Sequence, residues 1–143
     1  MDFLSALRIS ASGLSAERER VDLATSNLAN ADSTRGPDGQ PYKRQDPILR
    51  ATPFESAMSK EGMGGPQPMG VSVEGIAVDQ TPGRRVYSPG HPDADEQGFV
   101  TLPNVNPVHE VVNLVSASKA YDANATAVET LKGMALRALD IAK

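Results

Sequence analysis

All the prolines of this chain stand in its middle. The eleven prolines lie between Pro37 and Pro107, and ten of the twelve glycines lie between Gly36 and Gly98. Because proline breaks helices and an internal glycine weakens them by about 1 kcal/mol, long helices are confined to the two flanks. The sequence predicts an α+β fold of three parts: an N-terminal helical arm over 1–31, a small β-rich middle domain over 32–106 and a C-terminal helical arm over 107–143.

The first flank carries a seven-residue apolar repeat. Leu7, Leu14, Val21 and Leu28 stand seven positions apart, and Leu4 precedes them by one turn. This is the spacing of a coiled-coil seam, in which one stripe of a helix meets a partner helix. We therefore expect a helix over about residues 3–29 whose apolar stripe is a contact surface.

The second flank opens with a helix start signal. Asn106 is a suitable cap, Pro107 fits the first helical position, and the acidic Glu110 falls in the first turn. Apolar residues then follow at spacings of three and four, which predicts about 35 helical residues with one apolar stripe. The main members of this stripe include Val111, Leu114, Tyr121, Val128 and Leu139, and Val115, Leu131 and Leu136 widen it.

Two long stripes without a third helix predict association between copies of the chain. Two helices alone leave much of such stripes in water, and each Leu or Val that becomes buried contributes about 1.5–3 kcal/mol. In the alternative interpretation, the two arms simply pair with each other inside one chain. The candidate assembly interface comprises Leu4, Leu7, Leu14, Val21, Asn27, Leu28, Val111, Leu114, Tyr121, Val128, Leu131 and Leu139.

Asparagines interrupt the first stripe near its end. Asn30 and Asp32 precede the proline-rich segment and are typical of a helix that is ending. Asn27 flanks the seam position Leu28, where a single polar residue can fix the register of a coiled coil. We therefore expect the Asn27 amide to bond a neighbouring chain.

The middle segment contains short extended runs between turn residues. These runs cover 42–49, 71–80, 84–89 and 98–103, and the second is the best strand candidate. The segment 59–70 is rich in glycine and proline, which predicts a flexible exposed loop to which we assign no role.

One cluster in the middle has the residue types of a metal site or a catalytic site. His91, Asp93, Asp95 and Glu96 fall within six residues. However, a calcium loop starting at Asp93 would have Gln97 at its fifth position and an asparagine, not a glutamate, at its twelfth. A polar turn is the better interpretation, with a small metal-dependent enzyme as the alternative. The short catalytic signatures fail as well, so we expect no enzyme activity, no cofactor and no small-molecule substrate.

Charge and hydropathy exclude further classes. The formal net charge is −4 with no basic block, which argues against nucleic acid as a partner. Apolar runs stay well short of the 18–20 residues that a membrane span needs, and the start MDFLSALRIS lacks the pattern of a secretory signal. The absence of cysteine rules out disulfides and thiolate metal sites.

Four stretches carry a family resemblance that extends over nearly the whole chain. SASGLSAERERVDLATSNLANADSTR resembles the N-terminal signature of bacterial flagellar rod and hook proteins, the axial protein family. GPDGQPYKRQ, RRVYSPGHPDADEQGFVTLPNVNP and EVVNLVSASKAYDANATAVETLK narrow the resemblance to a rod member. The loop 59–70 matches no motif of the family.

The resemblance implies a structural role. Members assemble helically through their terminal helices into the rod, whose proximal part crosses the periplasm and transmits motor torque to the hook. The implied partners are other copies of the chain and the rod proteins FlgB, FlgF, FlgG and FliE. Export is implied through the flagellar type III apparatus, without a cleaved signal peptide.

The resemblance also implies that the terminal arms become ordered only on assembly. The apolar stripes are consistent with this expectation, because each arm lacks a partner until a neighbour arrives. Two alternatives remain beside the rod subunit: a free-standing coiled-coil adaptor, and another rod protein of the same axial family.

Overall fold

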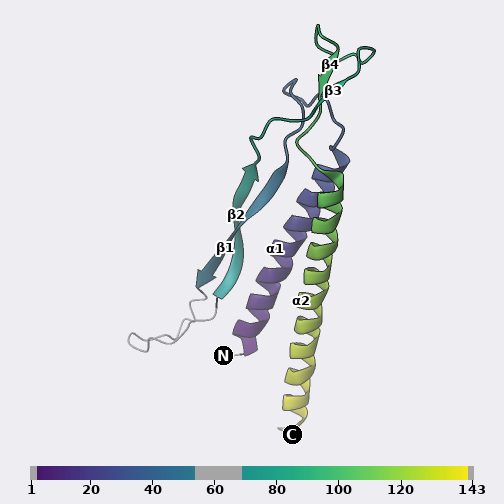
Figure 1. Cartoon of the computed structure of the whole chain (residues 1–143). Coiled ribbons are helices and arrows are strands. Elements are labelled where there is room, and N and C mark those ends of the chain that lie inside the picture. Colours follow the sequence, from purple (N-terminus) through teal and green to yellow (C-terminus); the bar gives the residue numbers. More distant parts are fainter. Residues whose placement is uncertain (1–2, 54–68, 142–143) are drawn as a thin grey trace.

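The computed structural model describes residues 3–53 and 69–141. Two long helices flank four strands, so the expected α+β class is confirmed (Figure 1). Most of the segment 59–70, which the sequence predicts as a flexible loop, lies outside the described residues. The elements are α1 (Phe3–Ala29), β1 (Gln45–Pro53), β2 (Met69–Val78), β3 (Arg85–Tyr87), β4 (Phe99–Thr101) and α2 (Pro107–Ile141).

The helices begin and end where local chemistry places them. The side-chain carbonyl oxygen of Asn106 accepts hydrogen bonds from the backbone N–H groups of Val108 at 3.0 Å and His109 at 3.4 Å. These bonds cap α2. At the end of α1, the Asn30 side chain donates to the Ser26 carbonyl at 2.9 Å. The expected helix limits therefore agree with the structure to within a residue or two.

The two helices lie side by side and run in opposite directions, as Figure 1 shows. Small residues allow this approach: a Cβ atom added to Gly13 would lie 3.0 Å from the Asn124 amide nitrogen, and Ala16 and Ala117 are buried. The intramolecular pairing, which the sequence left open as an alternative, is thus present within one chain. It leaves much of both stripes exposed.

The β1–β2 hairpin lies along α1 and is antiparallel, with a bulge between Ile48 and Leu49. The Ser12 hydroxyl of α1 accepts from the backbone N–H of Val71 at 3.1 Å. A Cβ atom at Gly70 would lie 3.1 Å from this hydroxyl oxygen, so a side chain there would displace the hydroxyl by a few tenths of an ångström. Since the hairpin and α2 each contact α1 and not each other, α1 is the central layer of the described structure.

The strands differ in detail from the predicted runs. β1 starts at Gln45 and not at residue 42, because residues 42–44 form the connection that leads into the sheet. β3 and β4 are only three residues long and pair with each other at the far end of the molecule (Figure 1). There the Arg85 guanidinium lies 4.9 Å from the centre of the Phe99 ring, which also packs edge-on against Tyr87.

The buried side chains gather where α1 ends, β1 starts and α2 begins. We call this region the junction; its buried members are Leu23, Ala24, Asn27, Ala31, Val105 and Glu110. After Ala117, α2 contributes no fully buried side chain among its described residues. Neither described helix is long and apolar enough to cross a membrane.

Candidate assembly interface

The structure divides the predicted interface residues of α1 into two groups. Leu7, Leu14, Val21 and Leu28 are half-buried, since they face partly into the helix pair and partly outward. Leu4 is 63% exposed at the free end of the helix. The seven-residue repeat therefore marks a half-covered stripe that keeps part of its apolar surface exposed.

The predicted residues of α2 divide in the same way. Leu114, Val128 and Leu131 are half-buried, whereas Val111, Tyr121 and Leu139 are exposed. Tyr121 and Val21 line an open cavity of about 290 Å³ beside the helix pair, together with Arg18, Ser118 and Asp122. This cavity is a recess on the side of the helix pair.

Two apolar surfaces were only partly recognised in the sequence. The first, which we call the α2 face, consists of Val108, Val111, Val112 and Val115, all exposed on the first turns of α2. At spacings of three and four these residues form one helical stripe. The sequence signal for this face was the adjacent pair Val111 and Val112, because Val112 lies outside the predicted stripe.

The second surface, which we call the hairpin face, consists of Leu49, Val73, Ile76 and Val78, all exposed. Leu49 pairs directly with Val73, and Pro47 pairs with Ile76. Paired residues and alternate residues share one side of a sheet, so these side chains form a single patch. An isolated two-stranded hairpin with such a patch gains stability when it packs against something.

The structure corrects the role predicted for Asn27. Its side chain is 1% exposed and makes four hydrogen bonds, all within the chain. The amide nitrogen donates to the Gln45 carbonyl at 2.8 Å and to a Glu110 carboxylate oxygen at 3.0 Å. The amide oxygen accepts from the Tyr42 hydroxyl and the Gln45 backbone N–H, each at 2.9 Å. Asn27 therefore fixes its own chain and has no capacity left for a neighbour.

Glu110 forms the other half of this cluster. Its carboxylate is 1% exposed and accepts from Arg44 Nε at 2.7 Å. Arg44 also pairs with Asp46, and its backbone N–H donates to the Asn104 side chain at 2.8 Å. Burial disfavours the charge on Arg44, but hydrogen bonds to Glu110 and Asp46 outweigh this effect and raise its pKa. The Arg44–Glu110 pair thus lies hydrogen-bonded inside the junction.

The acidic cluster in the middle segment forms a turn. The Asp95 carboxylate accepts from the backbone N–H groups of Phe99 at 2.8 Å and Gln97 at 2.9 Å, and pairs with Arg85. The Asp93 carboxylate accepts from the Thr34 hydroxyl at 2.8 Å. Within residues 3–53 and 69–141, no three metal-ligating side chains converge.

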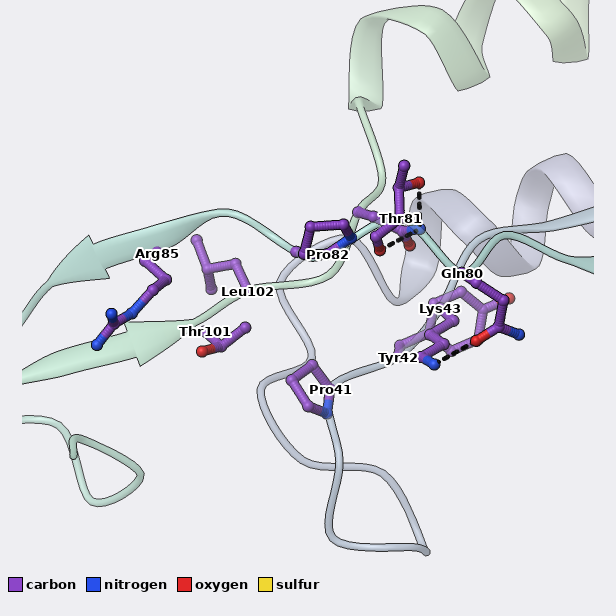
Figure 2. Close-up of a pocket in the computed structure, with 11 residues that line it drawn as sticks. Pro41, Tyr42, Lys43, Gln80, Thr81, Pro82, Arg85, Thr101 and Leu102 are labelled. Atoms are coloured by element: carbon purple, nitrogen blue, oxygen red, sulfur yellow. Dashed lines mark hydrogen bonds between the residues drawn. The ribbon is translucent and has the colours of Figure 1, made fainter.

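Figure 2 shows a cavity of about 330 Å³ between the α1–β1 connection, the β2–β3 connection and β4. Connecting segments supply most of its lining, among them Pro41, Pro82 and Leu102, and the strands contribute Arg85 and Thr101. Dashed lines mark the bond from Lys43 Nζ to Gln80 Oε1, at 2.6 Å, and the bonds from the Asn104 amide nitrogen to the backbone and hydroxyl oxygens of Thr81, at 3.2 and 3.3 Å. This lining holds neither a nucleophile–base pair nor a carboxylate pair, so it does not suggest catalysis.

Two family profiles match the flanks of the chain, and curated relatives match its whole length. A family profile described as flagella basal body rod protein matches residues 7–37, and a profile described as flagellar basal body rod FlgEFG protein C-terminal matches residues 96–141. The flagellar basal-body rod protein FlgC of Bacillus subtilis is 41% identical over 150 positions, which cover 100% of both chains. The chain belongs to the FlgC family of flagellar basal-body rod proteins.

Other members of the family are equally similar along their whole length. FlgC of Escherichia coli O6:H1 is 40% identical over 141 residues, covering 99% of this chain and 98% of the relative. FlgC of Borreliella burgdorferi is 39% identical over 153 positions, with the same coverage. The resemblance noted in the sequence is therefore confirmed, and the chain is a structural protein of the basal-body rod.

Proposed function

We propose that this FlgC-family chain is a proximal rod subunit that assembles helically through its terminal helices. One observation supports this proposal most strongly. The α2 face and the hairpin face are both exposed and apolar, and they belong to elements separated by the central helix α1. A contact between two such different faces of successive copies is heterologous. Heterologous contacts that do not close into a ring generate helical filaments.

The three sequence segments take distinct roles in this proposal. The arms 1–31 and 107–143 build the shaft, and the middle segment 32–106 supplies the hairpin face and the outward β3–β4 turn. The partners are further copies and the rod proteins FlgB, FlgF, FlgG and FliE, reached after export by the flagellar type III apparatus without a cleaved signal peptide. Interlocked helices in such a shaft would transmit torque from motor to hook across the periplasm.

The twelve predicted interface residues keep a place in this proposal with one exception. Asn27 leaves the set because its hydrogen bonds are all internal. The remaining leucines, valines and Tyr121 line the half-covered helix pair or its exposed outside. Val108, Val112 and the hairpin face join them. The free-standing adaptor alternative is disfavoured, because full-length relatives are rod proteins.

The test introduces charge on exposed positions, so that the subunit itself stays folded. Val112→Asp on α2 and Val73→Asp on the hairpin are expected to abolish incorporation into rods and motility, because a charge in an apolar contact costs several kcal/mol. Val112→Thr and Val73→Thr keep the side-chain shape without a charge and serve as controls that still assemble. The measurement is complementation of a strain lacking its own copy, with immunoblots of purified basal bodies. Normal rods built from both Asp variants would remove these faces from the interface.

A further inference from the structure

The junction joins four parts of the chain through polar side chains that lie inside it. Asn27 comes from the end of α1, Tyr42 and Arg44 from the α1–β1 connection, Gln45 from the first residue of β1, and Glu110 from the first turn of α2. The bond from Asn27 to Glu110 spans 83 positions in the sequence. Every described buried side-chain nitrogen or oxygen in the structure has a partner. A network of this kind costs free energy when it is only partly formed, because buried polar atoms are then left unpaired.

Burial falls away from the junction along both helices. The fully buried side chains of α2 end at Ala117. Among the described residues of α1 before Ala16, only Ser5 is fully buried, and Phe3 and Leu4 are exposed. Exposed backbone and few buried apolar contacts are the features of segments that open at low free energy. In each helix, the end at the junction is therefore held more firmly than the other end, although both helices are continuous in the structure.

We infer that the junction is a latch that keeps the inner parts of both arms folded onto β1 before the subunit joins a rod. Residues 23–31, 42–47 and 105–117 then behave as one cooperative unit in the unassembled chain. The outer parts, about residues 3–11 and 130–141, open independently and become firmly ordered only when neighbours cover them. Ordering on assembly thus concerns the outer parts of the arms, and the direction in which the hairpin leaves α1 is set beforehand.

Hydrogen exchange on the full-length, unassembled subunit tests the latch. In the unaltered protein, the three junction segments are expected to exchange at least tenfold more slowly than the two outer segments. Equal protection along both helices, or a junction that exchanges as fast as the outer segments, would overturn the inference.

Two variants test the coupling between the segments. Glu110→Gln removes the charge opposite Arg44 and is expected to raise exchange at least tenfold in all three junction segments together. Glu74→Gln is the matched control, because Glu74 pairs with Arg50 at 2.8 Å on the exposed hairpin. The control is expected to leave the junction unchanged.

A response of Glu110→Gln that stays within the first turns of α2 would contradict a cooperative unit. If Glu110→Gln does not fold at all, Tyr42→Phe decides, because it removes only the hydroxyl that donates to Asn27. Faster exchange in all three segments of Tyr42→Phe supports the latch. Faster exchange that is confined to residues near 42 would overturn the inference.

Discussion

Two buried polar side chains explain why an asparagine stands beside the apolar repeat of α1. Asn27 stands beside a seam position, yet it points into the junction and not toward another chain. Its amide offers two donors and two acceptor positions, and four bonds use them. No apolar residue at this position could hold the carboxylate of Glu110 and the start of β1 together.

The Arg44–Glu110 pair should contribute far more to stability than its exposed counterpart on the hairpin. Removing one partner of a buried ion pair costs about 3–5 kcal/mol, whereas exposed pairs contribute about 0–1 kcal/mol. We expect Arg44→Met to lower the free energy of unfolding by about 3 kcal/mol and Arg50→Met by less than about 1 kcal/mol. Urea unfolding followed by circular dichroism measures both. Equal losses in the two variants would mean that the junction pair is not special.

The turn at Asp95 predicts a pH effect of defined sign. Backbone N–H groups, chiefly that of Phe99, and the nearby Arg85 stabilise its carboxylate and lower its pKa below the ordinary value of 3.8. Because the pKa is lower in the folded state, the stabilisation is present above pH 3.8 and is lost as the pH falls through the folded pKa. An NMR titration of the Asp95 carboxyl carbon checks this. A midpoint at or above 3.8 would contradict the hydrogen bonds.

Among the elements, close backbone approaches decide where glycine cannot be replaced. A Cβ atom at Gly83 would lie 1.9 Å from the Leu102 carbonyl oxygen, directly beside the base of the β3–β4 pair. At Gly75, in β2, an added Cβ would meet nothing within 4 Å. We therefore expect an added methyl group to be tolerated at Gly75 and not at Gly83.

Gly83→Ala should loosen the β3–β4 pair, and Gly75→Ala should not. The clash at Gly83 involves backbone, which cannot swing aside, and forced shifts of this kind cost about 1–3 kcal/mol. The Leu102 amide donates to the Arg84 carbonyl at 2.8 Å, so its hydrogen exchange reports on this site. We expect faster exchange at Leu102 in Gly83→Ala alone. Unchanged exchange there would show that the strand base shifts freely.

Local signals in the sequence predicted the elements well. The confinement of proline to the middle placed both helices, and the cap at Asn106 with Pro107 after it placed the start of α2. These signals act within a few residues, and tertiary contacts did not override them. The exception is the run 42–44, predicted as strand, where Tyr42 and Arg44 instead extend into the junction.

What the sequence could not reveal depends on contacts between distant residues. The bond between Asn27 and Glu110 has no local signature, so the polar residue in the seam was assigned to a neighbouring chain. The packing of the hairpin on α1 depends on Ser12 and Gly70, which are small residues without a distinctive pattern. The apolar residues of the hairpin were visible, but their common exposed face emerged only from the register with its bulge.

As a whole, the molecule is ordered as hairpin, α1 and α2, with the junction at one end of the helix pair. Its two apolar faces lie on the outer layers. Two different apolar faces suit a member of the FlgC family, because subunits that assemble through heterologous contacts use different faces toward successive neighbours.

The most direct test asks whether both faces become covered in the rod. The chain contains no cysteine, so Val112→Cys and Val73→Cys each introduce a single thiol, and Glu96→Cys in the β3–β4 turn provides an exposed reference. Maleimide labelling is compared between the purified subunit and isolated basal bodies. We predict that Val112→Cys and Val73→Cys label readily in the subunit and at least tenfold more slowly in the rod, relative to Glu96→Cys. Equal labelling of both thiols in subunit and rod would contradict assembly through these faces.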